Sequence, residues 1–125
     1  MNFNLQHKTF MVGGATAGFG LAIANALLNE GAGVIAIARN QKPNNAFINS
    51  ANLIFECGDL FDHDFHDYLL DKYKKQNITG ALINAGGPPA GTFEQLGMAD
   101  WDTAYNAVIA WKVHFLQKLA APYET

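Results

Sequence analysis

Short apolar runs alternate along the chain with longer segments in which apolar residues recur at helical spacing. Four runs are predicted strands: 8–14, 33–40, 52–60 and 78–87. Three longer segments are predicted helices: 17–31, 62–77 and 100–121. The segment 41–51 is polar and contains Pro43, so it predicts at most a short helix. Strands that alternate with helices across short connections predict an α/β fold with a parallel sheet.

The ends of two predicted helices carry specific signals. Gly31 follows the first helix and is predicted to end it in the left-handed conformation. Asp100 is the predicted N-cap of the last helix, and Pro122 is predicted to stop that helix.

Composition narrows the class of protein. The chain has 125 residues, half of them apolar, and a formal net charge of -3, which fits one globular domain. The nearest approach to a basic cluster is Lys72, Lys74 and Lys75, at the end of a predicted helix, so we expect no nucleic-acid partner. The chain has one cysteine, Cys57, no secretory signal pattern and no apolar run of about 18 residues. These features predict a cytoplasmic protein with no membrane partner.

Three glycines, Gly14, Gly18 and Gly20, lie between the first predicted strand and the first predicted helix. A loop without side chains at this position brings backbone N–H groups to a phosphate at the positive end of the helix. The G-x-x-x-G-x-G pattern is weak alone, but its place after the first strand of an alternating chain strengthens it. The alternative is that these small residues only let the helix pack closely on the sheet.

Two further motifs, together with the glycines, are the basis of a resemblance to a known protein family. Residues 13–20, GGATAGFG, match the signature T-G-x-x-x-G-x-G except at the leading Thr, and N-A-G stands at 84–86. Asp59 follows the third predicted strand, in C-G-D-L. The chain therefore resembles the N-terminal half of a short-chain dehydrogenase/reductase over essentially its whole length. The resemblance implies an incomplete, NADP-binding domain over 1–125. Its fold would be a Rossmann-like, doubly wound parallel sheet with strand order 3-2-1-4 and the C-terminal strands missing.

The resemblance also implies a function. The chain would be the cofactor-binding portion of an oxidoreductase that transfers hydride between nicotinamide and a small carbonyl or alcohol substrate. The residues expected to bind the cofactor are Gly14, Thr16, Gly18, Phe19, Gly20, Arg39, Asp59, Leu60, Asn84, Ala85 and Gly86. For Asn84 the alternative is a polar residue that satisfies loop backbone at a strand end. For Asp59 the alternative is a charge at the N-terminus of a helix.

The end of the second strand predicts which nicotinamide cofactor is preferred. Folds that prefer NAD place an acidic residue there to bind the ribose hydroxyls, but this chain has Ala38 followed by Arg39. The planar guanidinium of Arg39 can pair with a 2′-phosphate and stack on adenine, with Lys42 as a weaker helper. We therefore predict NADP(H) rather than NAD(H). The alternative is that Arg39 is a solvated strand-end residue.

The catalytic residues that the resemblance implies, a Tyr-x-x-x-Lys pair and a serine, have no counterpart here. The one literal match, Tyr68 to Lys72, lies between strands three and four, and we interpret it as an i, i+4 surface pair. Ser50 precedes the third strand. We assign no catalytic residue and expect no turnover by the 125-residue chain alone. Many family members carry an Asn midway along the last helix; that place falls near Val108, and Asn106 stands two residues earlier.

Two histidines and three acidic residues gather at the start of the helix predicted over 62–77. They are Asp62, His63, Asp64, His66 and Asp67. Asp62 and His66 could share a helix face, as could His63 and Asp67, but the sequence implies no third ligand for either pair. We therefore interpret the group as a solvated first helical turn and predict no metal site. Three apolar residues lie near one face of the same helix: Phe65, Leu69 and Tyr73.

Two apolar stripes are predicted on the helix over 100–121. The first is expected to face the sheet: Trp101, Ala104, Tyr105, Val108, Ile109, Leu116 and Leu119. The second, Trp111 and Phe115, is expected to form a partner surface, and the resemblance implies a homo-oligomer through it. The alternative is that these two aromatic residues pack under a C-terminal half of the protein.

Two other functions stay open. A non-catalytic dinucleotide-binding module is one, although the unpaired edge of a fourth strand counts against it. A methyltransferase dependent on S-adenosylmethionine is the other, because its glycine loop is similar. Arg39 in place of an acid that would bind the ribose, together with the N-A-G motif, counts against the methyltransferase.

Overall fold

The computed structural model describes residues 2–39, 47 and 50–121. The chain divides into two compact units, which are described separately. The first contains residues 1–59 and 75–84, and the second contains residues 60–74 and 85–125. In the described residues, no helix combines the length and the apolar character needed to cross a membrane.

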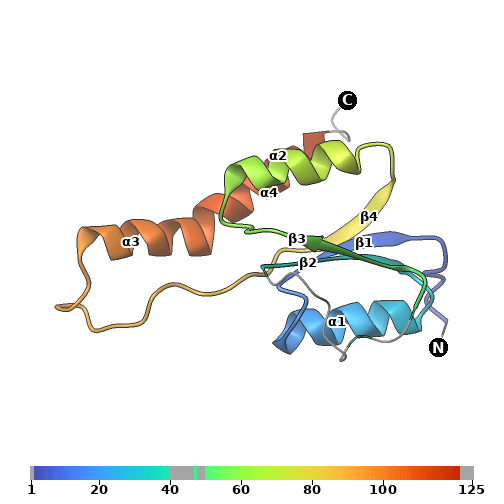
Figure 1. Ribbon diagram of the computed structural model, residues 1–125, viewed down its shortest axis with the longest axis horizontal. Helices are drawn as coiled ribbons and strands as arrows, with labels where there is room; N and C mark the ends of the chain where they lie inside the picture. The colour runs from blue at the N-terminus through green and yellow to red at the C-terminus, as the bar shows by residue number, and fades with distance from the viewer. Residues whose placement is uncertain (1, 40–46, 48–49, 122–125) are drawn as a thin grey trace. The chain divides into compact units, whose positions relative to one another are not determined.

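The first unit is built on a four-stranded parallel sheet (Figure 1). Its strands are β1 (Thr9–Gly13), β2 (Gly33–Ala38), β3 (Leu53–Cys57) and β4 (Ile78–Leu82). Their order in the sheet is β3-β2-β1-β4. This confirms the predicted α/β, Rossmann-like class and strand order. β2 is central and buried over Val34 to Ala38, as its continuous apolar sequence requires.

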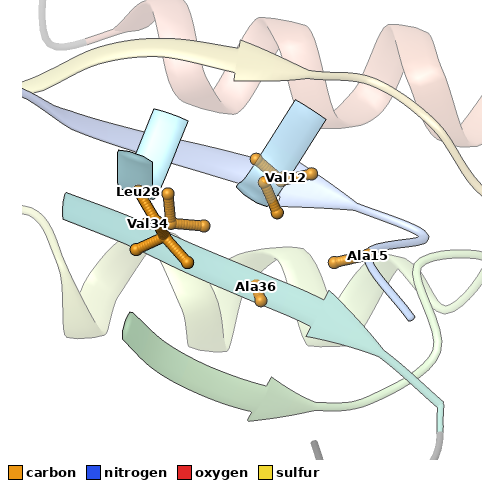
Figure 2. Close-up of a cluster of buried hydrophobic side chains, with 6 residues drawn as sticks. Val12, Ala15, Leu28, Val34 and Ala36 are labelled. Carbon is orange, nitrogen blue, oxygen red and sulfur yellow. The ribbon is translucent and has the colours of Figure 1, made fainter. Parts of the chain in front are cut away.

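Helix α1 (Gly18–Asn29) lies along one face of this sheet (Figure 1). Its contact with the sheet is a cluster of six buried residues: Val12, Ala15, Ala24, Leu28, Val34 and Ala36. Figure 2 shows Leu28 of α1 against Val34 of β2, with Val12 of β1 in the same layer. Gly31 has a φ of 85° just after the helix, which confirms the predicted left-handed end.

The second unit is helical. It contains α2 (His63–Lys72), α3 (Met98–Tyr105), a π-helical segment η1 (Asn106–Ala110) and α4 (Trp111–Ala120). α2 and α4 lie side by side (Figure 1), and an ion pair of 3.2 Å joins Lys118 Nζ of α4 to Asp67 Oδ1 of α2. Asp62 caps α2, because its Oδ1 accepts the N–H of Asp64 at 3.0 Å.

The start of the last helical stretch differs from the prediction. Gly97, not Asp100, is its N-cap, and Asp100 lies in the first turn. The carboxylate of Asp100 accepts the N–H of Gly97 at 2.9 Å, so it satisfies a free backbone donor from the third helical position. Pro122 and most of segment 41–51 lie outside the described residues.

The burial of the two predicted stripes on this stretch is the reverse of the prediction. Trp111 is 1% exposed and Phe115 is 2% exposed, whereas Tyr105, Val108 and Leu116 are about half exposed. The prediction that Trp111 and Phe115 form a partner surface is therefore wrong. Trp111 packs against Phe61, with ring centroids 6.2 Å apart.

The physical reason is a change of helical period together with buried polar groups. In the π-helical segment, the N–H of Trp111 bonds the carbonyl of Asn106, five residues back, so a 3.6-residue period does not run through the stretch. The buried side runs through Ala107, Trp111 and Phe115. It also includes the half-buried Asn106 and His114, which a pattern of apolar residues assigns to the surface.

We predict that Leu28→Ala lowers the free energy of unfolding by about 2–5 kcal/mol, because it opens a cavity in the α1 cluster. Ile23→Ala is the matched control, since Ile23 lies on the same helix and is 37% exposed. It should lower the free energy by clearly less. Chemical denaturation of both variants measures the difference, and equal losses would contradict the packing described.

Candidate functional site

The predicted site residues of the first unit follow the carboxyl ends of its strands. The glycine loop follows β1, Arg39 follows β2, Asp59 comes two residues after β3, and Asn84 comes two residues after β4. In a parallel sheet these ends lie at one edge. The register supports this, because Gly13, the last residue of β1, pairs with Ile37, and Ala38, the last residue of β2, pairs with Cys57, the last residue of β3.

The glycine loop adopts a backbone that requires glycine at two positions. Gly14 has a φ of 58° and Gly18 has a φ of 56°, both in the left-handed region. Between them, the N–H of Ala15 bonds the carbonyl of Ile37 at 3.2 Å. This bond fastens the loop to the end of β2.

Gly18 and Gly20 serve different purposes. A Cβ on Gly20 would collide with the carbonyl oxygen of Gly14 and would lie 2.9 Å from that of Gly13, so α1 packs here against main chain. A Cβ on Gly18 would meet nothing within 4 Å. The packing interpretation of the glycines therefore holds for Gly20, while Gly18 leaves open space beside the loop.

The N-terminus of α1 has neither a side-chain cap from its N-cap residue nor an acidic residue in its first turn. Its N-cap is Ala17, which offers no side-chain hydrogen bond, and its first turn contains no acidic residue. The first hydrogen bond of the helix runs from the N–H of Leu21 to the carbonyl of Ala17 at 3.2 Å. Because Ala17 provides no acceptor and the first turn contains no carboxylate, the positive end of this helix favours an anion. Phe19, in this turn, is 84% exposed.

Arg39 stands exposed beyond the end of β2. In the described part of the chain, no carboxylate forms an ion pair with its guanidinium. Its backbone is held, because its carbonyl accepts the thiol of Cys57 at 3.3 Å. The neighbouring Ala38 carbonyl accepts the N–H of Gly58 at 3.0 Å. Asp59, which is also exposed, therefore follows directly on a segment fastened to the end of β2.

Asn84 connects the end of β4 to the glycine loop. Its Nδ2 donates to the carbonyl of Gly13 at 3.4 Å, which is the backbone role considered above as its alternative. The side-chain oxygen of Asn84 is not used by this bond. Leu60, Ala85 and Gly86 belong to the second unit, and their part in a cofactor site stays a prediction. Lys42 lies outside the described residues.

The literal Tyr-x-x-x-Lys match is a neighbouring pair on α2. Lys72 Nζ donates to Tyr68 Oη at 3.4 Å and stands 5.6 Å from the centre of that ring. Tyr68 is half exposed, as expected for an i, i+4 surface pair. Ser50 accepts the N–H of Asn52 at 3.1 Å in the turn before β3.

The interpretation of His63 and His66 as a solvated turn is wrong. His66 is 0% exposed and bonds His114 of α4, a residue that the sequence analysis did not single out. His66, Leu69 and Tyr73 follow one another at helical spacing, and both latter residues are buried as predicted, so the period could have placed His66 inside. In the described residues, no three His, Cys, Asp or Glu side chains are placed to hold a metal ion.

Asn106 takes part in the same packing. Its Nδ2 donates to the carbonyl of Phe61 at 3.0 Å, and its Oδ1 lies 3.1 Å from His63 Nε2. The side chain of Asn106 therefore fastens η1 to the start of α2. Val108, the position expected to replace the family Asn, is 47% exposed.

The chain is similar to known proteins in sequence and in fold. A family model described as short chain dehydrogenase matches residues 8–122. No curated protein matches the chain. A short-chain dehydrogenase from Streptomyces avermitilis is 22% identical, with a TM-score of 0.83, over 92% of this chain and 44% of that one.

Two further solved structures share the fold. L-sorbose reductase from Gluconobacter frateurii, complexed with NADPH and L-sorbose, is 19% identical over 94% of this chain and 48% of that one, with a TM-score of 0.81. Ligand-free aldohexose dehydrogenase from Thermoplasma acidophilum is 25% identical over 96% of this chain and 45% of that one, with a TM-score of 0.74. The chain spans less than half the length of these three proteins.

We predict that Gly20→Ala lowers the free energy of unfolding by about 1–3 kcal/mol in the absence of any ligand, because the added methyl must displace the main chain of the loop. Gly87→Ala is the control, since a Cβ there meets nothing within 4 Å. Chemical denaturation of the two variants makes the comparison. If Gly20→Ala were as stable as Gly87→Ala, α1 would not depend on this close approach.

Proposed function

The chain belongs to the short-chain dehydrogenase family, and on this basis we propose that it is the cofactor-binding portion of an NADP(H)-dependent oxidoreductase. The cofactor would donate or accept a hydride, and the other reactant would be a small carbonyl or alcohol compound. Residues 1–125 would form part of one dinucleotide-binding domain. The observation that carries the proposal is the glycine loop, which leads into the uncapped N-terminus of α1 at the carboxyl edge of the sheet.

The main chain of this loop is proposed to hold the pyrophosphate. Three features support this: the open space at Gly18, the left-handed backbone at Gly14 and Gly18, and the N-terminus of α1, which has no cap from Ala17 and no acidic residue in its first turn. Thr16 and Phe19 lie in the same loop and are proposed to contact the cofactor beside it. A phosphate here would meet backbone N–H groups and no side chain on Gly18.

Arg39 is proposed to select NADP(H) over NAD(H). It is exposed at the end of β2, where NAD-binding folds place an acid, and no carboxylate of the described residues competes for its guanidinium. The structure of L-sorbose reductase, which shares the fold, contains NADPH. Asp59 and Leu60 are proposed to border the adenine, and Asn84, Ala85 and Gly86 the ribose on the nicotinamide side.

A non-catalytic dinucleotide-binding module is the second candidate. In the described residues β4 pairs in the sheet with β1 alone, so β4 is an edge strand. That edge suits the pairing of a further strand and disfavours a module made of these four strands. A methyltransferase is the weaker alternative, because the family match covers residues 8–122.

The presence of one exposed cysteine, Cys57, supports a cytoplasmic location as part of the proposal.

A homo-oligomer through the last helical stretch stays a prediction, but not through Trp111 and Phe115, which are buried. The apolar residues exposed on this stretch include Tyr105, Val108, Ile109 and Leu116. They are the side chains available for such a contact.

We predict that Arg39→Ala raises the dissociation constant for NADPH about 10- to 100-fold and that for NADH by clearly less, because only NADPH carries the 2′-phosphate, whereas both cofactors carry the adenine on which Arg39 can stack. Fluorescence titration of both cofactors measures the effect. Lys8→Ala is the control for a lost positive charge, since Lys8 precedes β1 at the opposite edge of the sheet. Equal dissociation constants for NADPH and NADH in the unmodified chain would contradict the role of Arg39. Binding of neither cofactor would contradict the role of the glycine loop.

We also predict that the purified 125-residue chain does not oxidise NADPH with carbonyl substrates, even where it binds the cofactor. Its only Tyr-x-x-x-Lys match is the pair on α2, whose members bond each other. Absorbance at the NADPH band measures the reaction. A rate that survived Tyr68→Phe would locate catalysis elsewhere in this chain, and a rate abolished by it would make Tyr68 a catalytic residue.

A further inference from the structure

Three histidines come together where α2 and α4 meet. His63 and His66 lie on α2, and His114 lies on α4. The ring centroids of His63 and His114 are 4.4 Å apart, and those of His66 and His114 are 4.9 Å apart. The chain has four histidines, and this cluster contains three of them.

The hydrogen bonds of His66 fix where its proton lies. Its Nε2 is 2.7 Å from the carbonyl of Leu60, and since a carbonyl only accepts, Nε2 carries the hydrogen. Its Nδ1 is 2.7 Å from Nδ1 of His114. Two ring nitrogens at this distance share one hydrogen, so in the neutral pair His114 donates from Nδ1 and His66 accepts.

His63 is oriented by Asn106. The Nδ2 of Asn106 donates to the Phe61 carbonyl, which leaves its Oδ1 to accept from Nε2 of His63. The rings of His63 and His114 are then stacked, with 15° between their planes. Each of the three imidazoles thus has a defined tautomer when the cluster is neutral.

The surroundings of His66 oppose a positive charge. The rings of Trp111 and Phe115 lie edge-on to it, at 6.1 and 5.2 Å, and its side chain has no exposed surface. Burial is the main cause that lowers the pKa of His66 below 6.5, and His114 and His63 lower it further. The Leu60 carbonyl and Asp67 act in the opposite direction. Asp67 is itself paired with Lys118 of α4.

We propose that this histidine cluster is an acid-sensitive clamp, which holds α2 against α4 while its imidazoles are neutral and releases α4 when His66 and His114 both take up protons. A first additional proton goes to Nε2 of His114, which leaves the single hydrogen between the two Nδ1 atoms in place. A second goes to Nδ1 of His66 and places two N–H groups against each other at 2.7 Å, with no acceptor between them.

The sign of the pH dependence follows from the lowered pKa. Because folded His66 binds a proton less readily than the unfolded chain, acid favours the unfolded state. The stabilisation by neutral His66 is complete above about pH 6.5 and is lost as the pH falls below that value. Histidine titration occurs between about pH 5 and 8, above the range in which exposed carboxylates titrate.

The test is the denaturant midpoint of the 125-residue chain between about pH 5 and pH 7.5, followed by the fluorescence of Trp111 in a Trp101→Phe background. The midpoint should fall on acidification. His114→Gln, which keeps a hydrogen-bonding side chain but removes the pairing of the two Nδ1 atoms, should reduce this fall. His7→Asn, which removes an exposed histidine outside the cluster, should leave the fall unchanged.

Nitrogen NMR of the imidazole rings provides a second readout that does not depend on variant stability. At pH 7.5 the hydrogen of His66 should lie on Nε2 and that of His114 on Nδ1, and His66 should titrate below 6.5. Titration of His66 at or above 6.5, or the same fall in midpoint with and without His114, would overturn the proposal. So would a loss of stability at pH 7.5 on adding a chelator, since a metal ion would then join the two Nδ1 atoms.

Discussion

The approach of helix α1 to the main chain after β1 is the constraint on which the first unit depends. Gly20 lies against the carbonyls of Gly13 and Gly14 so closely that no side chain fits between them. That contact sets the first turn of the helix directly behind a loop of left-handed glycines. The N-terminus of α1 that this contact positions has no side-chain cap from Ala17, and a Cβ on Gly18 beside it would meet nothing within 4 Å. Close packing and the proposed anion binding would therefore follow from one arrangement.

The parallel sheet then brings the other candidate residues to this edge. β2 and β4 both pair with β1, so residues just past their ends come beside the loop after β1, and β3 ends beside β2 at the same edge of the sheet. Hydrogen bonds hold these ends together: Ala15 to Ile37, Gly58 to Ala38 and Asn84 to Gly13. The proposed site would therefore be made from backbone that these hydrogen bonds hold in place, and Arg39 would add a positive side chain to it.

The sequence was sufficient for features that depend on local pattern. The strand positions, the strand order implied by the resemblance and the left-handed Gly31 are confirmed, because continuous apolar runs predict buried strands and a glycine after a helix predicts a left-handed end. The last helical stretch was predicted with the wrong face inward. The π-helical segment breaks its period, and the buried side includes Asn106 and His114, whose partners lie 43 to 48 residues away. A pattern of apolar positions does not record such pairings.

The two units are consequently stabilised by different physical means. The cluster beneath α1 is wholly apolar, so its contribution to stability does not change with the protonation of any side chain. The contact between α2 and α4 includes a buried imidazole, and in the described residues no buried side-chain nitrogen or oxygen lacks a partner. A polar network of this kind stabilises a fold only while each donor meets an acceptor. Protonation of His66 in mild acid turns its accepting Nδ1 into a donor, so this condition is no longer met, whereas the apolar cluster does not change. We therefore expect the second unit to be the first to lose its packing.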